Sequence, residues 1–224
     1  MIAATPASYK TFLALYWVAR MGLRTLFFSA DTDQFEMAKR ATAMVSGERQ
    51  DDVARRITDY ADLLAQLNIR WVFESDPTYT DLALETAAYA EAFGDFPEVI
   101  VIDNLMNVVG ENENEWSSMR DTTKAIKRLV RITEAALFVL HHMGEDKADQ
   151  SMPQPRSKLQ GKVSQLPEII LSLSANGDEL RVAPVKNRFG PGDASGQTFV
   201  SLFLDPERVQ IFNNRYDKQA GIPA

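Results

Sequence analysis

The stretch MIAATPASYKTFLALYWVARMG, residues 1–22, decides how the rest of the sequence is interpreted. It opens with an apolar segment and a loop containing Pro6, and it continues as TFLALYWVARMG, whose apolar residues recur at helical spacing up to Gly22. The next segment, LRTLFFSAD, is a continuous apolar run between polar residues, as expected of a buried parallel strand. This order predicts the first β-loop-α-β unit of an α/β sheet.

The loop before the first helix carries two of the polar side chains of a phosphate-binding loop. The P-loop pattern is G-x-x-x-x-G-K-[ST], and here Lys10 and Thr11 keep the last two positions while Ala4 and Tyr9 replace the glycines. In such a loop the lysine neutralises phosphate charge and the hydroxyl holds Mg²⁺ at the helix N-terminus. Tyr9 strains the loop if its position needs a positive φ. The alternative is an ordinary strand-helix turn with an exposed lysine, and without a ligand we expect Lys10 to be solvated.

Composition limits the remaining choices. The 224 residues are 45% hydrophobic and 25% charged, which predicts one α/β domain. The absence of cysteine excludes disulfides, cysteine-ligated zinc and thiol catalysis, and two adjacent histidines cannot form a zinc site alone. No membrane-length apolar run or secretion signal is present, so we expect a cytoplasmic protein with no membrane contact. Because the net charge is −7 and the pI about 5, nucleic-acid binding must be local.

The rest of the chain alternates helical and strand patterns up to residue 142 and then changes to strands. This order predicts a mostly parallel sheet covered by helices on both faces, followed by an antiparallel extension. We expect one domain over residues 1–213 and a flexible tail over 214–224. Residues 143–161 lack periodicity and are interpreted as a long mobile loop. The predicted helices cover residues 34–45, 52–67, 80–93 and 115–133, the predicted strands 69–75, 97–104 and 136–142, and the two predicted hairpins 168–188 and 198–212.

Two predicted strands end in an aspartate. Asp103 closes EVIVID at the ligand edge of the sheet, where a carboxylate can hold Mg²⁺, and the alternative is an ordinary strand-end turn residue. Asp31 closes TLFFSAD, where a carboxylate can polarise the water that attacks a phosphate. The alternative for Asp31 is a helix N-cap, although Asp33, with Glu36 three residues later, fits a cap better.

The remaining candidates are two histidines and two cations. His141 and His142 close the strand after Asp103, and strand alternation allows at most one of them to enter the site, where it could sense the γ-phosphate. The alternative is one buried and one solvated ring. Lys186 and Arg188 lie on the same side of a predicted strand tip, which suits insertion into a neighbour's phosphate site. A solvated turn is the alternative.

In order and spacing these pieces resemble the RecA-like ATPase core, and most closely the C-terminal domain of DnaB-type replicative helicases. That family's loop reads A-A-R-P-S-M-G-K-T and residues 3–11 read A-A-T-P-A-S-Y-K-T, so Tyr9 is the departure. The family's S-L-E-M falls on SADT, V-V-I-D-Y-L-Q-L-M resembles IVIDNLMNV, S-Q-L-N falls on HHMG, and K-x-R-x-G resembles KNRFG. The spacer S-G-A-I-E-Q-D-A-D-V-V-L aligns with QGKVSQLPEIIL. The resemblance covers nearly the whole chain and extends to phage and plasmid relatives of hexameric RepA-type helicases.

The resemblance implies a role for each candidate residue. Asp31 falls on the catalytic glutamate and His142 on the sensor glutamine, while Lys186 and Arg188 would act on a neighbour's phosphates. Thr11 and Asp103 would form the metal shell. The nucleotide-binding set is Pro6, Ala7, Ser8, Tyr9, Lys10, Thr11 and Arg40. Single-stranded DNA would pass the loops near 107–115 and 144–162, at Lys147, Arg156, Lys158 and Lys162.

The leading hypothesis is a DNA-stimulated motor of the DnaB-like helicase type that uses ATP and Mg²⁺, assembles as a hexameric ring and works with replication or recombination proteins. The rival is a RecA-core DNA-binding or recombination-mediating protein that binds nucleotide and hydrolyses it poorly, which Tyr9 and the short Asp31 favour. A third hypothesis is a scaffold without nucleotide. Because the loop lies close to Met1, we expect the N-terminal domain that in DnaB proteins docks primase and supports the ring to be missing.

Overall fold

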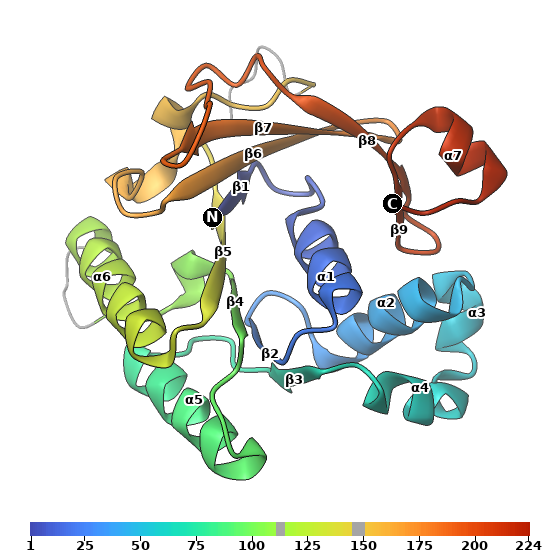
Figure 1. Ribbon diagram of the computed structural model, residues 1–224, viewed down its shortest axis with the longest axis horizontal. Coiled ribbons are helices and arrows are strands. Elements are labelled where there is room, and N and C mark those ends of the chain that lie inside the picture. The colour runs from blue at the N-terminus through green and yellow to red at the C-terminus, as the bar shows by residue number, and fades with distance from the viewer. Residues whose placement is uncertain (111–114, 145–150) are drawn as a thin grey trace.

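The computed structural model describes residues 1–110, 115–144 and 151–224, and for residues 115–118 and 162 it describes the backbone alone. In these ranges the strands form one nine-stranded sheet in the order β3-β2-β4-β5-β1-β6-β7-β8-β9 (Figure 1). The strands from β3 to β6 in this order pair in parallel, whereas β7, β8 and β9 are antiparallel. The bounds are β1 Ile2–Ala4, β2 Thr25–Ser29, β3 Ile69–Val72, β4 Val99–Asp103, β5 Ala136–His142, β6 Ile169–Asn176, β7 Glu179–Asn187, β8 Val200–Asp205 and β9 Gln210–Phe212.

Helices cover both faces of this sheet. α1 and α2 pack in one apolar cluster and α5 and α6 in another on the opposite face, as the two sides of Figure 1 show. This arrangement confirms the predicted α/β fold with an antiparallel extension. The α-helices are α1 Lys10–Met21, α2 Gln34–Ser46, α3 Gln50–Ala54, α4 Ala61–Ala65, α5 Tyr79–Phe93, α6 Glu115–Thr133 and α7 Arg215–Ala220, and the 3₁₀ helices are η1 Ile57–Tyr60, η2 Leu105–Asn107, η3 Arg156–Lys158 and η4 Gln160–Lys162.

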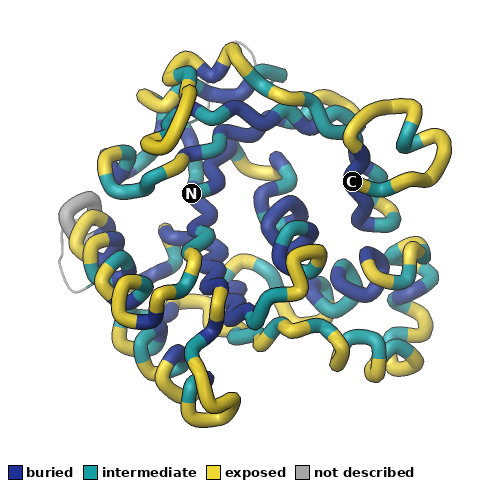
Figure 2. The backbone as a smooth tube through the Cα atoms, viewed as in Figure 1, coloured by how far each residue is buried: buried dark blue, intermediate teal, exposed yellow. Residues whose placement is uncertain are grey.

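The continuous apolar strands follow from burial on both sides. In β4, Val99 and Val101 face the α1 and α2 cluster, while Ile100 and Ile102 face the α5 and α6 cluster. Successive side chains of a strand point to opposite faces, so a strand between two helical layers must be apolar at every position. The buried path through the central strands and α1 is visible in Figure 2.

Helix ends follow the local signals in the sequence. Gly22 takes the left-handed conformation, with φ 65°, that ends α1. Asp33 begins α2, and its carboxylate accepts from the backbone N–H of Phe35 at 2.9 Å and of Glu36 at 3.0 Å. The predicted N-cap is therefore confirmed. The Glu36 side chain pairs with Lys39 in the following turn.

The single helix predicted over residues 52–67 is wrong. The chain forms α3, η1 and α4 there instead. The Arg56 guanidinium and the Tyr60 hydroxyl both bond to the carboxylate of Glu48, and Ile57 packs against the α1 and α2 cluster. These tertiary contacts break a segment whose apolar residues have helical spacing. Intrinsic helix propensity is weak and is readily overridden by tertiary packing.

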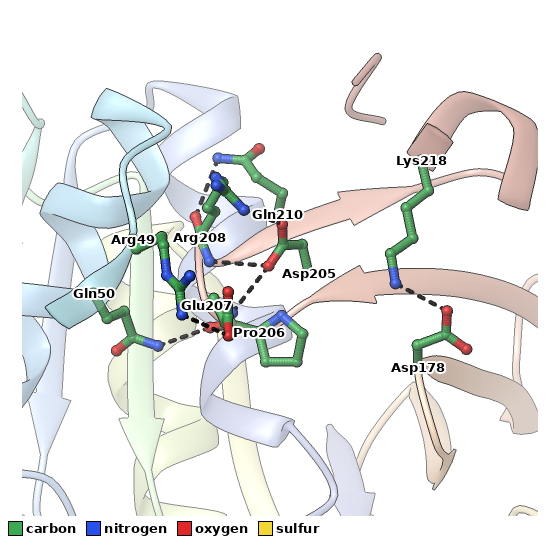
Figure 3. A network of polar contacts seen from close by, with 9 residues as sticks. All are labelled: Arg49, Gln50, Asp178, Asp205, Pro206, Glu207, Arg208, Gln210 and Lys218. Carbon is green, nitrogen blue, oxygen red and sulfur yellow. Dashed lines mark hydrogen bonds and ion pairs between the residues drawn. The ribbon is translucent and has the colours of Figure 1, made fainter. Parts of the chain in front are cut away.

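The turn between β8 and β9 is joined to the N-terminus of α3, as Figure 3 shows. The Gln50 side-chain amide donates to the Pro206 carbonyl at 2.7 Å, and the Gln50 backbone N–H donates to the Glu207 carbonyl at 2.8 Å. Arg49 forms an ion pair with Glu207 at 3.0 Å. The antiparallel extension is thus fastened to the parallel core at the edge where the P-loop lies.

Two segments expected to be irregular contain local structure. Residues 215–220 form α7, and the last carbonyl, of Ala224, accepts from the Tyr16 hydroxyl at 2.6 Å. The described part of the 143–161 segment contains η3, the start of η4 and a bridge between Met143 and Leu159, while residues 145–150 lie outside the described ranges. The predicted flexibility of 214–224 and mobility of 143–161 stay predictions.

Candidate nucleotide site

Strand register brings the candidate site residues to one edge of the sheet. Ala4, at the end of β1, pairs with His142 at the end of β5, and Ser29, at the end of β2, pairs with Asp103 at the end of β4. The loop after β1 and Asp31, just past β2, therefore lie at the same carboxyl edge. In open α/β sheets ligands bind at this edge.

The loop between β1 and α1 is braced by its own side chains. The Thr5 and Ser8 hydroxyls lie 2.9 Å apart, and Ser8 donates to the Pro6 carbonyl at 3.3 Å. Tyr9 is left-handed, with φ 58°, and Ala7 has φ 57°. A left-handed conformation costs a residue with a side chain about 1–2 kcal/mol, and glycine has no such penalty. The position that the P-loop pattern gives to glycine therefore does need a positive φ, although Tyr9 occupies it.

The Tyr9 ring packs on its own helix. Its ring meets that of Phe12 edge to face, with 5.6 Å between the ring centres. Such a pair contributes about 0.5–1.5 kcal/mol beyond the area that it buries. This contact offsets part of the backbone strain at Tyr9 and gives the loop an aromatic wall.

Lys10 is not solvated, contrary to the expectation from sequence. The residue is only 8% exposed, and its ammonium donates to the carbonyls of Thr5 at 3.1 Å and Ala4 at 3.4 Å. Burial lowers the pKa of Lys10, and the nearby carboxylates of Asp103 and Asp31 oppose that change. The expectation was wrong because Lys10 is the first residue of α1 and points back across the end of β1.

Thr11 and Asp103 meet across the edge of the sheet. The Thr11 hydroxyl donates to the Asp103 carboxylate at 2.5 Å, and Asp103 is 1% exposed. Burial raises the pKa of Asp103 to about 6, even though the hydrogen bond from Thr11 lowers it. Desolvation of the carboxylate therefore outweighs the Thr11 hydrogen bond and the positive charges of Lys10 and Arg40.

These two oxygen donors suit a hydrated divalent cation. Mg²⁺ keeps several waters and takes one or two protein carboxylates together with phosphate oxygens. Among the residues that the structure describes, no group of three or more His, Cys, Asp or Glu side chains forms a metal cluster. A cation that needs an all-protein cage does not fit this site, whereas Mg²⁺ held with phosphate does.

Asp31 and His142 are joined through Asn104. The Asn104 side-chain amide donates to the Asp31 carboxylate and lies 3.3 Å from Nε2 of His142. Burial lowers the pKa of His142, with Lys10 adding to the effect, so the ring is neutral near pH 7. Sequence reasoning missed Asn104. The available signal was its position directly after Asp103 at the carboxyl end of a buried strand.

His141 points to the other face, as strand alternation requires. It is fully buried, and its Nε2 lies 3.0 Å from the carbonyl oxygen of Gln160. Burial lowers the pKa of His141 to about 4. Of the two histidines, the structure therefore brings His142 to the P-loop edge.

These side chains surround one pocket of about 650 Å³. This volume is within the range of small-molecule sites. The β8–β9 turn and the start of α3, held together as in Figure 3, form its outer wall through Pro206 and Gln50, which no pattern in the sequence places beside the P-loop. The pocket is lined by Pro6, Ala7, Ser8, Tyr9, Lys10, Thr11, Phe12, Asp31, Arg40, Gln50, Asp103, His142 and Pro206.

Lys186 and Arg188 lie at the opposite edge of the sheet. Lys186 pairs with Ile170 near the start of β6, a strand that runs parallel to β1, so it is far from the P-loop of its own chain. Its ammonium donates to the carbonyls of Ser164 and Gln165, each at 2.9 Å. The Arg188 side chain is 54% exposed and forms an ion pair with Glu168 at 2.6 Å.

Comparison with known proteins places this arrangement in a family. The family model described as AAA domain matches residues 1–148. The chain belongs to the AAA domain family. It is 31% identical over 225 residues to the Gene 65 protein of Mycobacterium phage L5, covering 94% of this chain and 84% of that protein. It is 27% identical over 225 residues to the Gene 65 protein of Mycobacterium phage D29, covering 94% and 97%.

Solved structures share the fold of this AAA domain. One of them, described as an ATPase domain, has a TM-score of 0.77 at 18% identity and covers 95% of this chain and 83% of that one. A DnaB-like replicative helicase, whose structure also concerns its interactions with primase, has a TM-score of 0.75 at 18% identity. The match covers 95% of this chain and 56% of the helicase chain, so this chain spans little more than half of that protein. The fold is the RecA-like P-loop ATPase fold, as the sequence resemblance predicted.

Four residues were predicted to contact DNA, and the structure describes the side chains of two of them. Lys147 is outside the described residues, and Lys162 is described by its backbone alone. Arg156 is exposed and Lys158 half-buried, both in η3. Arg156 is close enough to Lys186 to contribute to the lowered pKa of that lysine. No helix in the described part of the chain is long and apolar enough to cross a membrane.

Proposed function

We propose that this AAA domain is a Mg-ATP-dependent motor ATPase of the DnaB-like helicase type, stimulated by single-stranded DNA and active as a homo-oligomeric ring. The observation that carries the proposal is the convergence of Lys10, Thr11 and Asp103 with Asp31 and His142 on one pocket at the carboxyl edge of a RecA-like sheet. These groups can bind phosphate, hold a cation and polarise water, which are the parts of phosphoryl transfer to water.

Each side chain has a role that follows from its chemistry. Lys10 turns its ammonium from the Ala4 and Thr5 carbonyls to the phosphates, and the backbone N–H groups at the start of α1 add donors there. Thr11 and Asp103 hold Mg²⁺, which when bound neutralises phosphate charge. Asp31 orients and polarises the attacking water, and His142, which lines the pocket, senses the terminal phosphate.

Lys186 and Arg188 act on a neighbouring subunit. They lie at the other edge of the sheet from the P-loop of their own chain, so they cannot reach their own nucleotide. An arginine supplied in trans contributes about 10³- to 10⁵-fold in the rate of related reactions. To act in this way, Arg188 must exchange its ion pair with Glu168 for the neighbour's phosphates. Action in trans requires a neighbouring subunit, which we propose to be supplied by a hexameric ring.

Mixing two inactive variants tests action in trans. The Lys10→Ala variant lacks phosphate binding, and the variant with alanine at both Lys186 and Arg188 lacks the trans cations. Mixed rings should recover part of the ATPase activity, because some interfaces then pair an intact pocket with an intact Lys186 and Arg188. Full activity of the double variant alone would contradict the trans role.

A second function is favoured by the left-handed Tyr9, with φ 58°, at a glycine position. A strained loop with an aromatic wall and the short Asp31 carboxylate suit a DNA-binding or recombination-mediating protein that binds nucleotide as an assembly switch and turns it over slowly. Steady-state ATPase rates and nucleotide affinity, measured with and without single-stranded DNA, separate the two. DNA-stimulated turnover supports the motor, binding without turnover supports the switch, and absence of binding contradicts both.

A further inference from the structure

Asn104 has the contacts of a residue that organises others. It directly follows β4, is 2% exposed, and uses all of its side-chain amide. Nδ2 donates to the Asp31 carboxylate and approaches Nε2 of His142 at 3.3 Å, and Oδ1 accepts from the backbone N–H of Met106 at 2.8 Å. One buried amide therefore connects two strands of the sheet with the 3₁₀ helix η2.

The chemistry of these partners fixes the orientation of the amide. If the Asn104 amide were turned over, its oxygen would face the Asp31 carboxylate and its NH₂ group would face the N–H of Met106. Both contacts would be repulsive, because a carboxylate only accepts and a backbone N–H only donates. The two hydrogens of Nδ2 therefore point to Asp31 and His142.

The hydrogen-bond partners of the two histidine rings also bear on which nitrogen of each ring is protonated. If Nε2 of His142 accepts from Asn104 in the ligand-free protein, the proton of the neutral ring is on Nδ1, a buried atom that has no hydrogen-bond partner among the described residues. Nε2 of His141 faces the carbonyl of Gln160, which only accepts, so its proton is on Nε2. Adjacent histidines in one strand thus have opposite tautomers.

We propose that Asn104 is a positioning residue that holds Asp31 and His142 in a fixed relation at the phosphate end of the pocket. Asp31 is exposed on the bend after β2, and among the described residues Asn104 is the donor to its carboxylate. Asn104 is itself anchored to η2, which ends at Asn107, where the segment predicted to approach DNA begins. The proposal rests on the proposed ATPase function for its kinetic consequence, but its structural consequence can be measured separately.

The Asn104→Asp variant tests the positioning of Asp31 and His142 while keeping the local structure of η2. Aspartate has the same shape and caps a helix as well as asparagine, so its carboxylate still accepts from Met106 and preserves η2. It cannot donate to Asp31 or His142, and it places a second carboxylate beside Asp31. Asn68→Asp makes the same chemical change at an exposed site, where Asn68 donates to the Gly22 carbonyl at 2.8 Å.

The kinetic result expected for Asn104→Asp is a fall in kcat of about 100-fold, the size typical of a misplaced catalytic group, with little change in KM for ATP. Asn68→Asp should leave both unchanged. A kcat for Asn104→Asp equal to or above that of the wild type would contradict the proposal, because Asn104 would then be structural or inhibitory.

A second readout is the tautomer of each ring, read from the ¹⁵N chemical shifts of the two histidines, with His142→Gln used for assignment. The wild type should show one ring protonated on Nδ1 and one on Nε2, and Asn104→Asp should move the His142 proton to Nε2. A wild-type His142 protonated on Nε2 would refute the contact without any variant. A wild type that binds ATP without turnover would refute the motor, and the tautomers would still decide the role of Asn104.

Discussion

Replacing Asp103 by asparagine should stabilise the ligand-free protein at neutral and alkaline pH. Asp103 is 1% exposed, and burial raises the pKa of its carboxyl from 3.8 to about 6. One pKa unit corresponds to about 1.4 kcal/mol, so the ionised carboxylate costs the folded state about 3 kcal/mol. Asparagine keeps the shape and can still accept from the Thr11 hydroxyl, without the buried charge.

The sign of the pH dependence follows from proton binding. Below pH 3.8 both states of the wild type hold the proton, and Asp103 carries no penalty. Between pH 3.8 and about 6 the unfolded chain releases this proton while the folded protein retains it, so the wild type loses stability relative to the variant as pH rises. The difference in unfolding free energy should grow over this window and be constant above about pH 7.

Urea unfolding without nucleotide or Mg²⁺, at pH values from 4 to 8, measures this difference. At pH 8 the variant should be about 3 kcal/mol more stable, which corresponds to a Tm about 6–12 °C higher for a chain of this size. Asp59→Asn, at an exposed site in η1, is the matched control for the loss of one carboxylate. Mg-ATP should stabilise the wild type and not Asp103→Asn. An equal or lower stability of Asp103→Asn at pH 8 would refute the inference that burial of the ionised carboxylate destabilises the folded protein.

Two further predictions concern the P-loop. Tyr9→Gly should keep or improve ATP affinity, measured by calorimetry, and a large loss of affinity would mean that the ring contacts the nucleotide. The variant should change the free energy of unfolding by less than about 1 kcal/mol. Relief of the left-handed strain is offset by the greater chain entropy of glycine and by loss of the Phe12 contact. Lys10→Ala should lose ATP binding and remain folded by circular dichroism. Burial lowers the pKa of Lys10, so the folded ligand-free protein gains no stability from its positive charge. Unchanged ATP affinity would remove the P-loop assignment.

The sequence predicted those parts of the fold that depend on local pattern. Strands buried on both faces must be apolar at each position, and Gly22 and Asp33 give helix ends that need only their own neighbours. The division of residues 52–67 depends on Glu48, whose carboxylate meets Arg56 and Tyr60 after the chain has folded back. No window of sequence contains that contact.

In the candidate site, too, short motifs could be predicted from the sequence and contacts between distant residues could not. The P-loop pattern and the acids at strand ends were readable, because each is a short motif tied to one edge of the sheet. The burial of Lys10 depends on how α1 leaves the loop, and the role of Asn104 depends on the register of β2, β4 and β5 together. Gln50 enters the pocket wall through a contact with Pro206, more than 150 residues away in the chain.

The charge of the pocket supports completion of the site by a neighbour. Lys10 and Arg40 are the cations among the described residues that line the pocket, and the carboxylates of Asp31 and Asp103 balance them. Even with Mg²⁺, a bound nucleoside triphosphate would bring a net negative charge into this pocket, and that charge would need further stabilisation during transfer. The cations that can supply this stabilisation, Lys186 and Arg188, lie at the far edge of the same chain. If the proposed function holds, a lone subunit would meet the phosphates with a pocket that has no surplus positive charge, whereas the proposed ring would bring those two cations to each nucleotide. Assembly and catalysis would then be coupled by charge balance.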